Sequence, residues 1–182
     1  LEIQMLRNLV SKTLKYSPIL MAMLVMPALT NAQLREPENL KVGAERGGAY
    51  LPIAHEYSVA VVTNQTSMVD NMHLVDFLVD RYVNVSKVFA PEHGFRGEAG
   101  AGEKVNSGKD AKTGLPIVSL YGSNKKPTAE QLADVGLVIF DIQDVGARFY
   151  TYISTMTYVM EACAEQGKKM IILDRPNPNG YY

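Results

Sequence analysis

Five runs of apolar residues without polar alternation constrain the fold of this chain most. They occupy residues 57–64, 85–90, 115–122, 136–143 and 168–174. Strands of this composition are typical of parallel sheets that are buried on both faces. Helical patterns lie between several of the runs, which is the alternation of an α/β chain. The sequence therefore predicts an α/β fold with an open, doubly wound parallel sheet of Rossmann-like topology. A fragment of a TIM barrel is the alternative.

Three segments between these runs have helical patterns. They are residues 69–82, 126–135 and 149–167. Asp70 is the expected cap of the first helix. In the second, Thr128 and Gln131 have the spacing of a reciprocal capping box. The third is expected to end at Gly167, because glycine commonly closes helices.

The first 32 residues have the pattern of a secretory signal. Arg7, Lys12 and Lys15 precede the apolar run 18–29, and small residues at 30–32 follow it. A membrane anchor or a buried helix is the alternative, although the run is short for a bilayer span. We therefore expect a signal peptide over residues 1–32, a periplasmic or secreted protein, and no stable membrane anchor after cleavage.

The 182 residues suffice for one domain. Of the whole chain, 47% is hydrophobic, which indicates a globular protein. Residues 33–57 are expected to form a connecting arm, and residues 58–182 a Rossmann-like domain. That domain is expected to be incomplete at its C-terminus, because no helix follows the last strand. With 18 basic and 19 acidic residues and no basic tract, nothing predicts nucleic-acid binding. The single cysteine, Cys163, excludes an internal disulfide and is expected to be a buried, inert thiol.

Polar side chains follow every apolar run at its C-terminal end. In a parallel sheet these ends share one edge, where ligand crevices form. Cap or turn chemistry explains any single one, Asn64 and Asp174 in particular, but not five strand ends together. The set comprises Asn64, Glu92, His93, Tyr121, Asp141, Gln143, Asp144, Asp174 and Arg175.

The glycine-rich stretch VFAPEHGFRGEAGAGEKV (88–105) matches no nucleotide-binding loop. Its glycines are not in the order of a dinucleotide or phosphate-loop motif, and no helical pattern follows them. The chain has no histidine or cysteine pair at ligand spacing and no nucleophile elbow. We therefore predict no cofactor and no metal. The glycines instead suit a long loop that folds close over the crevice.

Carboxylate chemistry remains, with Glu92 as a candidate general acid at the end of an apolar strand. Asp141 or Asp144 is a candidate second carboxylate of the kind that glycosidases use. Arg148 and Arg175 are able to pair with these acids instead, which is the structural alternative.

Aromatic residues accompany these acids. Tyr121, Phe149, Tyr150 and Tyr152 are candidates for stacking on sugar rings. The alternative is that Tyr152 and Tyr158 pack the last helix onto the sheet.

Several long motifs resemble one family. TNQT, APEHGFRGEAGAGE, LPIVSLYG, FDIQDVGARFYTYISTM and ILDRPNPNG together resemble the bacterial exo-β-N-acetylmuramidases of the NamZ type. The resemblance implies an exported glycosidase that removes terminal β-linked N-acetylmuramic acid from peptidoglycan fragments. It also implies a Rossmann-like N-terminal domain and a smaller C-terminal domain with the cleft between them. Because the family continues beyond the DRPN turn, the second domain is expected to be missing from this chain.

The resemblance makes Glu92 the expected catalytic residue and peptidoglycan-derived saccharides of the MurNAc-GlcNAc type the expected partners. The expected substrate-binding residues are Asn64, His93, Arg96, Tyr121, Asp141, Gln143, Asp144, Arg148, Tyr150, Asp174 and Arg175. Two alternatives stay open. One is a non-catalytic periplasmic module that binds muropeptides or sugars, and the other is a cell-wall esterase or amidase.

Overall fold

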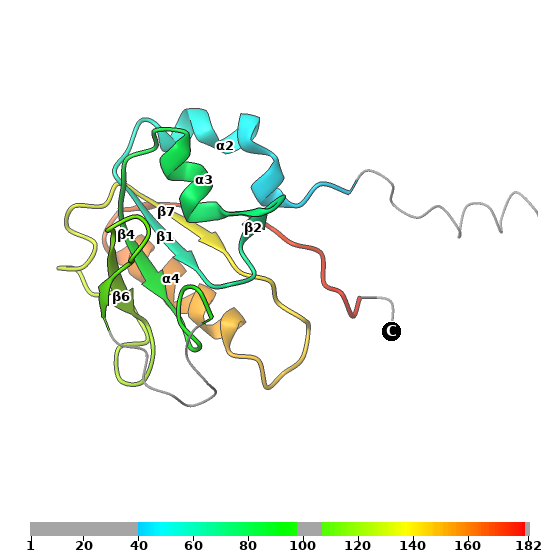
Figure 1. Cartoon of the computed structure of the whole chain (residues 1–182). Helices are drawn as coiled ribbons and strands as arrows, with labels where there is room; N and C mark the ends of the chain where they lie inside the picture. Colours follow the sequence, from blue (N-terminus) through cyan, green and yellow to red (C-terminus); the bar gives the residue numbers. More distant parts are fainter. Residues whose placement is uncertain (1–39, 98–106, 181–182) are drawn as a thin grey trace, which may run out of the picture. The chain divides into compact units, whose positions relative to one another are not determined.

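A computed structural model describes residues 40–97 and 107–180 (Figure 1). The expected signal peptide and residues 98–106, which include the C-terminal part of the glycine-rich stretch, lie outside this part. Among the described residues, no helix is long and apolar enough to cross a membrane.

The main sheet has six strands in the order β5-β6-β4-β1-β7-β8. All neighbours in it are parallel except β5 and β6. Numbered as they occur in the chain, the five parallel strands have the order 3-2-1-4-5 of Rossmann-like folds. The strands are β1 (Val59–Thr63), β4 (Val85–Ala90), β5 (Gly108–Lys109), β6 (Pro116–Ser119), β7 (Leu137–Asp141) and β8 (Lys169–Ile172).

This topology confirms the predicted fold class. Each of the five apolar runs contains one parallel strand, and the run 85–90 coincides with β4. In a TIM barrel, successive strands of the chain are neighbours in the order 1-2-3-4-5, and the helices form one outer layer. The order 3-2-1-4-5 therefore excludes a fragment of a TIM barrel.

Helices cover both faces of this sheet (Figure 1). α2 (Gly47–Ala54) and α3 (Leu74–Asp80) pack on one face, and α4 (Tyr152–Glu165) packs on the other. A short 3-10 helix, η1 (Gly43–Glu45), precedes α2. Part of the segment that we expected to be a connecting arm is therefore helical.

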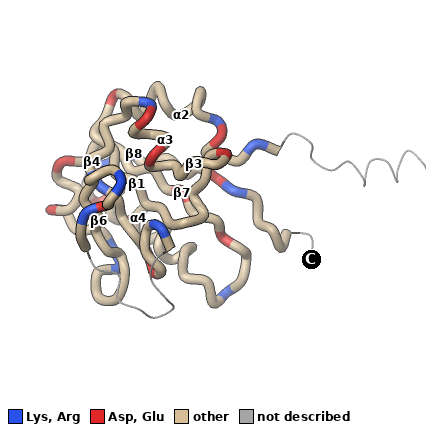
Figure 2. The backbone as a smooth tube through the Cα atoms, in the orientation of Figure 1, with Lys and Arg blue, Asp and Glu red and all other residues tan. Residues whose placement is uncertain are grey.

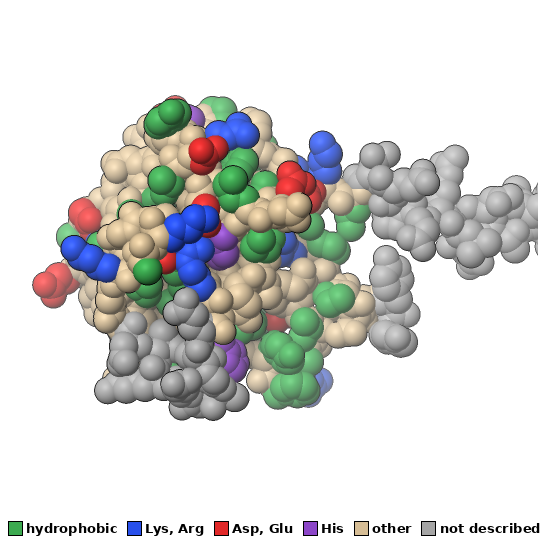
Figure 3. Space-filling model, viewed as in Figure 1, with side chains coloured by type: hydrophobic (Ala, Val, Ile, Leu, Met, Phe, Trp, Pro, Cys, Tyr) green, Lys and Arg blue, Asp and Glu red, His purple; other side chains and the backbone are tan. Residues whose placement is uncertain are grey.

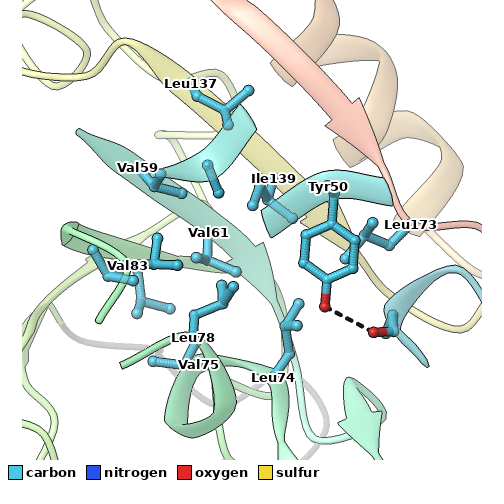
Figure 4. Close-up of a cluster of buried hydrophobic side chains, with 14 of the residues drawn as sticks. Tyr50, Val59, Val61, Leu74, Val75, Leu78, Val83, Leu137, Ile139 and Leu173 are labelled. Atoms are coloured by element: carbon cyan, nitrogen blue, oxygen red, sulfur yellow. Dashed lines mark hydrogen bonds between the residues drawn. The ribbon is translucent and has the colours of Figure 1, made fainter. Parts of the chain in front are cut away.

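The alternation of side chains along β1 explains the two layers. Val59 and Val61 join the core under α2 and α3, where the Tyr50 hydroxyl donates a hydrogen bond to the Ala44 carbonyl at 2.7 Å (Figure 4). Ala60 and Val62 face the second core, under α4. Fully burying a side chain of the size of valine stabilises the fold by roughly 1.5–3 kcal/mol.

Charged residues lie mostly outside the central strands (Figure 2). On the face shown in Figure 3, side chains of both signs are interspersed between small hydrophobic patches. Cys163 is buried in the second core, as expected, and burial raises the pKa of its thiol to about 11. The thiol is therefore protonated and unreactive at neutral pH.

Two of the predicted helices differ from the structure. The segment 126–135 contains the expected reciprocal bonds between Thr128 and Gln131, but residues 129–134 form turns rather than an α-helix. Because β7 begins at Leu137, the chain must change direction after about one turn. The segment 69–82 is helical only from Leu74, because residues before it form a small hairpin of β2 (Met68–Val69) and β3 (Met72–His73).

His73, not Asp70, caps α3. Its Nδ1 accepts a hydrogen bond from the Val75 amide at 3.2 Å, and its Nε2 donates to the Asn64 carbonyl at 2.9 Å. This pattern requires a neutral ring, since a protonated Nδ1 cannot accept. Asp70 lies in the hairpin turn with φ of 50°. The buried imidazole thus connects the start of α3 to the end of β1.

We expect the neutral form of His73 to make stability depend on pH. Burial lowers the pKa of His73 below its ordinary 6.5, so the unfolded chain binds more protons below that pH. The free energy of unfolding should therefore fall as the pH drops below about 6.5, by at most ~1.4 kcal/mol per pH unit. Urea denaturation between pH 7.5 and about 5.5 measures this slope.

The matched variants are His73→Asn and His55→Gln. Asparagine preserves a capping acceptor without titrating, so His73→Asn should flatten the slope, whereas the exposed His55 should leave it unchanged. An unchanged slope in His73→Asn would contradict the assignment.

Candidate active site

Three neighbouring strands deliver polar residues to one edge of the sheet. Asn64 follows β1, Glu92 lies two residues beyond β4, and Asp141 ends β7. The strand order reverses between β1 and β7, and β4 lies on the other side of β1. Ligands of Rossmann-like folds bind outside the carboxyl ends of the strands at this point.

Asp141 and Arg175 form a buried ion pair at this edge. Asp141 has no exposed surface, and the side chain of Arg175 is 8% exposed. The guanidinium donates from Nε to Oδ1 at 2.5 Å and from Nη2 to Oδ2 at 2.9 Å. Burial raises the pKa of Asp141, and Arg175 opposes that rise. The contacts therefore show Arg175 paired with an acid of the protein, which was the structural alternative.

The same guanidinium also holds the β2–β3 hairpin. Its Nη2 donates to the Met68 carbonyl at 2.8 Å, while the neighbouring Ser67 hydroxyl donates to the Asp141 carbonyl. The end of β7, the hairpin and the chain after β8 thus meet at one ion pair.

We expect Arg175→Met to lower the free energy of unfolding by about 3–5 kcal/mol, because it leaves the Asp141 carboxylate buried without a partner. Replacing both partners, in Asp141→Leu with Arg175→Met, should recover much of this loss. Denaturant unfolding of both variants measures the difference. A double variant no more stable than the single one would contradict the explanation.

Arg96 has two carboxylate partners instead of a place in a cavity. It donates to both oxygens of Asp110 at 2.8 Å and to both oxygens of Asp76 at 3.0 and 3.3 Å. Hydrogen bonds from Arg96 hold the pKa of Asp110 well below its usual range. This cluster therefore joins Arg96, within the glycine-rich stretch, and Asp110, beyond its C-terminal end, to α3.

Glu92 lines a cavity of about 210 Å³ at the carboxyl edge. Tyr121, from the chain after β6, is the other predicted residue in its wall. The remaining lining residues are Leu120, Lys125, Thr151, Ser154, Thr155 and Tyr158. The volume is below the roughly 300–1,000 Å³ of typical small-molecule sites. The described residues thus form a cavity for part of a larger ligand.

The turn that carries Glu92 has a strained conformation at the next residue. The Gly94 amide donates to the Pro91 carbonyl at 3.0 Å, closing a β-turn whose third residue is His93. The φ of His93 is 72°, a region that favours glycine. Such strain costs of order 1 kcal/mol or more and is typical of functional sites. It fixes the direction in which Glu92 and His93 leave the strand.

We expect His93→Gly to raise the free energy of unfolding by up to about 1 kcal/mol, as relief of strain exceeds the added entropy of the unfolded chain. Tyr82→Gly is the matched control, because Tyr82 has φ of 58° and is 91% exposed outside the cavity. Denaturant unfolding should show that both variants are stabilised. Destabilisation by His93→Gly alone would show that its side chain has a structural function.

Three buried polar atoms at this edge have no hydrogen-bond partner among the described residues. They are Thr63 Oγ1, Asn64 Nδ2 and Asp144 Oδ1. An unsatisfied buried group of this kind costs about 1–3 kcal/mol. A ligand with hydroxyl or amide groups has the donors and acceptors that would satisfy them. Nearby, burial raises the pKa of the Tyr152 phenol, the Asn64 side chain opposes that rise, and the charge of Glu92 adds to it.

The other predicted residues lie on the rim of this edge. Gln143 donates to the carbonyls of Asp144 and Pro176 at 2.7 and 2.9 Å, so its amide supports the backbone. The Tyr150 ring contacts Phe149 at a tilt and Tyr152 edge-on, with ring centroids 5.2 and 6.2 Å away. Arg148 and Asp174 are exposed.

Besides Leu120, five cavity residues were not predicted from the sequence: Lys125, Thr151, Ser154, Thr155 and Tyr158. Four of them lie on one face of α4 or at its N-cap, at positions i, i+3, i+4 and i+7. That spacing of hydroxyl groups at the start of a helix was the available signal. Tyr152 packs in the core as the alternative stated, but Tyr158 lines the cavity instead. Among the described residues, no three His, Cys, Asp or Glu side chains converge to hold a metal.

The fold and the cavity define a Rossmann-like α/β protein with a carboxylate-bearing ligand site at the carboxyl edge of its sheet. The chain belongs to the family described as exo-beta-N-acetylmuramidase NamZ, N-terminal, whose model matches residues 59–182. It is 49% identical over 124 residues to the peptidoglycan beta-N-acetylmuramidase NamZ of Bacillus subtilis (strain 168). That match covers 67% of this chain but only 30% of the relative, so the chain spans less than a third of that protein.

Two solved structures of DUF1343 family proteins from Bacteroides fragilis NCTC 9343 are also similar. One is 47% identical, with a TM-score of 0.66 over 78% of this chain and 36% of that protein. The other is 41% identical, with a TM-score of 0.68 over 76% of this chain and 35% of that protein. The similarity confirms the fold class and the family resemblance that the motifs indicated.

Proposed function

We propose that this chain carries the catalytic glutamate of an exo-acting glycosidase that releases terminal β-linked N-acetylmuramic acid from peptidoglycan fragments. The observation that carries the proposal is the position of Glu92 in a polar cavity at the carboxyl edge of the parallel sheet. The Bacillus subtilis relative, whose name states a peptidoglycan beta-N-acetylmuramidase, supports the substrate class.

Glu92 is the candidate general acid. Its side chain is half-buried on a turn of fixed geometry and faces a cavity with hydroxyl and aromatic groups. A carboxyl group in this position is able to protonate the leaving oxygen of a glycosidic bond, as glycosidases do. The hydroxyls of Thr151, Ser154 and Thr155 suit a sugar, and the rings of Tyr121 and Tyr158 offer apolar faces.

The contacts favour Asp144 over Asp141 as a second carboxylate. Asp141 has both oxygens engaged by Arg175. Asp144 has one oxygen engaged by the Gly146 amide and one without a partner. Asp144 is therefore the predicted acid that retains an acceptor for a water or a sugar hydroxyl.

The proposal includes an exported protein, periplasmic or secreted, with no stable membrane anchor after cleavage and no nucleic-acid partner. The basic and apolar pattern of residues 1–32 supports export. Its partners would be saccharides of the MurNAc-GlcNAc type, since peptidoglycan lies outside the cytoplasm.

The test is turnover of a chromogenic N-acetylmuramide by the full-length protein. Glu92→Gln preserves shape but removes the proton donor, so kcat should fall by about 10²–10⁴-fold. Glu56→Gln, an exposed change outside the cavity, should leave turnover unchanged.

Three outcomes would contradict the proposal. Full activity of Glu92→Gln would remove Glu92 from the chemistry. Sugar binding without any turnover by the unmodified protein would indicate a binding module. Cleavage of acyl substrates alone would indicate an esterase or amidase.

A further inference from the structure

Among the residues that the structure describes, Lys125 is the only cationic side chain in the wall of the cavity that contains Glu92. It lies on the loop after β6, and residues at the start of α4 line the same cavity. Among the described residues, no ion pair or hydrogen bond engages its ammonium group, whereas Arg96 and Arg175 are each paired with buried carboxylates. The cavity thus contains a cation whose partner is not another described residue.

The loop holds Lys125 in place through its neighbours. On one side, Asn124 Nδ2 donates to the Ser119 carbonyl at 2.7 Å, which anchors the loop to the end of β6. On the other side, Lys126 pairs with Glu161 at 3.2 Å and Glu165 at 2.8 Å, which anchors it to α4. With both neighbours fixed, Lys125 remains at the cavity wall.

The start of α4 adds to the positive potential at this wall. Thr151, the N-cap residue of α4, lines the cavity, and its side chain makes no capping hydrogen bond. The first amides of a helix carry partial positive charge and favour anions. The ammonium and the helix start therefore together favour an anionic substituent beside the group that Glu92 protonates.

We propose that Lys125 determines specificity by binding the carboxylate of the lactyl substituent of N-acetylmuramic acid. This inference rests on the proposed function. The lactyl ether is what distinguishes N-acetylmuramic acid from N-acetylglucosamine, and its carboxylate is ionised at neutral pH. An ammonium group forms a charge-assisted hydrogen bond with such a carboxylate, whereas a neutral sugar offers it no comparable partner.

The experiment compares two chromogenic muramides on the full-length protein. One has the free lactyl carboxylate, and in the other the carboxylate is converted to the neutral amide. Lys125→Met should lower kcat/KM for the acid by about 10-fold or more and leave the amide within about 2-fold. Lys125→Arg preserves the charge and should retain most of the preference for the acid. Lys168→Met, at the opposite edge of the sheet before β8, should change neither.

Equal losses on both substrates would overturn the inference, because they would mean that Lys125 acts on Glu92 or on the fold. An unmodified protein that does not prefer the acid would overturn it as well.

A failure of the proposed function is distinguished from a failure of this inference by a binding measurement. If the unmodified protein cleaves neither substrate, calorimetric binding of N-acetylmuramic acid and N-acetylglucosamine replaces turnover. If Lys125→Met weakens binding of N-acetylmuramic acid but not of N-acetylglucosamine, the result supports carboxylate recognition in a non-catalytic site. Equal affinity of the variant and the unmodified protein for N-acetylmuramic acid overturns it.

Discussion

The ion pair between Asp141 and Arg175 determines the geometry of the carboxyl edge. A carboxylate with no exposed surface at the end of a central strand is costly unless a cation satisfies it. Arg175 does so from the chain after β8 and also binds the Met68 carbonyl of the hairpin. Because the hairpin leads into α3, whose cap His73 binds the Asn64 carbonyl, the arrangement of β1, β7 and α3 depends on this single contact.

The charges near the site divide into two groups with different functions. Asp141, Arg175 and Arg96 are paired within the protein and maintain its shape. Glu92 and Lys125 line the cavity without such a partner among the described residues. The first group makes the edge rigid, so the second group is presented to a ligand in a fixed arrangement, which lowers the entropy that binding must overcome.

The strands were predictable from the sequence because a strand buried on both faces requires a continuous run of apolar residues. The run 85–90 is β4 itself, and the other four runs each contain a strand. Contacts between residues far apart in the sequence produce no comparable pattern. Nothing in the spacing shows that Arg175 pairs with Asp141, or that Arg96 spans from Asp76 to Asp110. Lys125 was not predicted for the same reason, since its position depends on how its loop is anchored to α4.

Among the described residues, the unsatisfied buried side-chain groups lie close to the candidate site rather than throughout the core. Within the described ranges, the buried side-chain atoms without a partner belong to Thr63, Asn64 and Asp144, all near the ends of β1 and β7. His93, with its positive φ, lies beside β4, the next strand. The other buried side-chain N and O atoms in this part have hydrogen-bond partners. Unsatisfied polar atoms are therefore not a general feature of this fold. Unsatisfied donors and acceptors beside a strained turn are what a site requires when a polar ligand completes it.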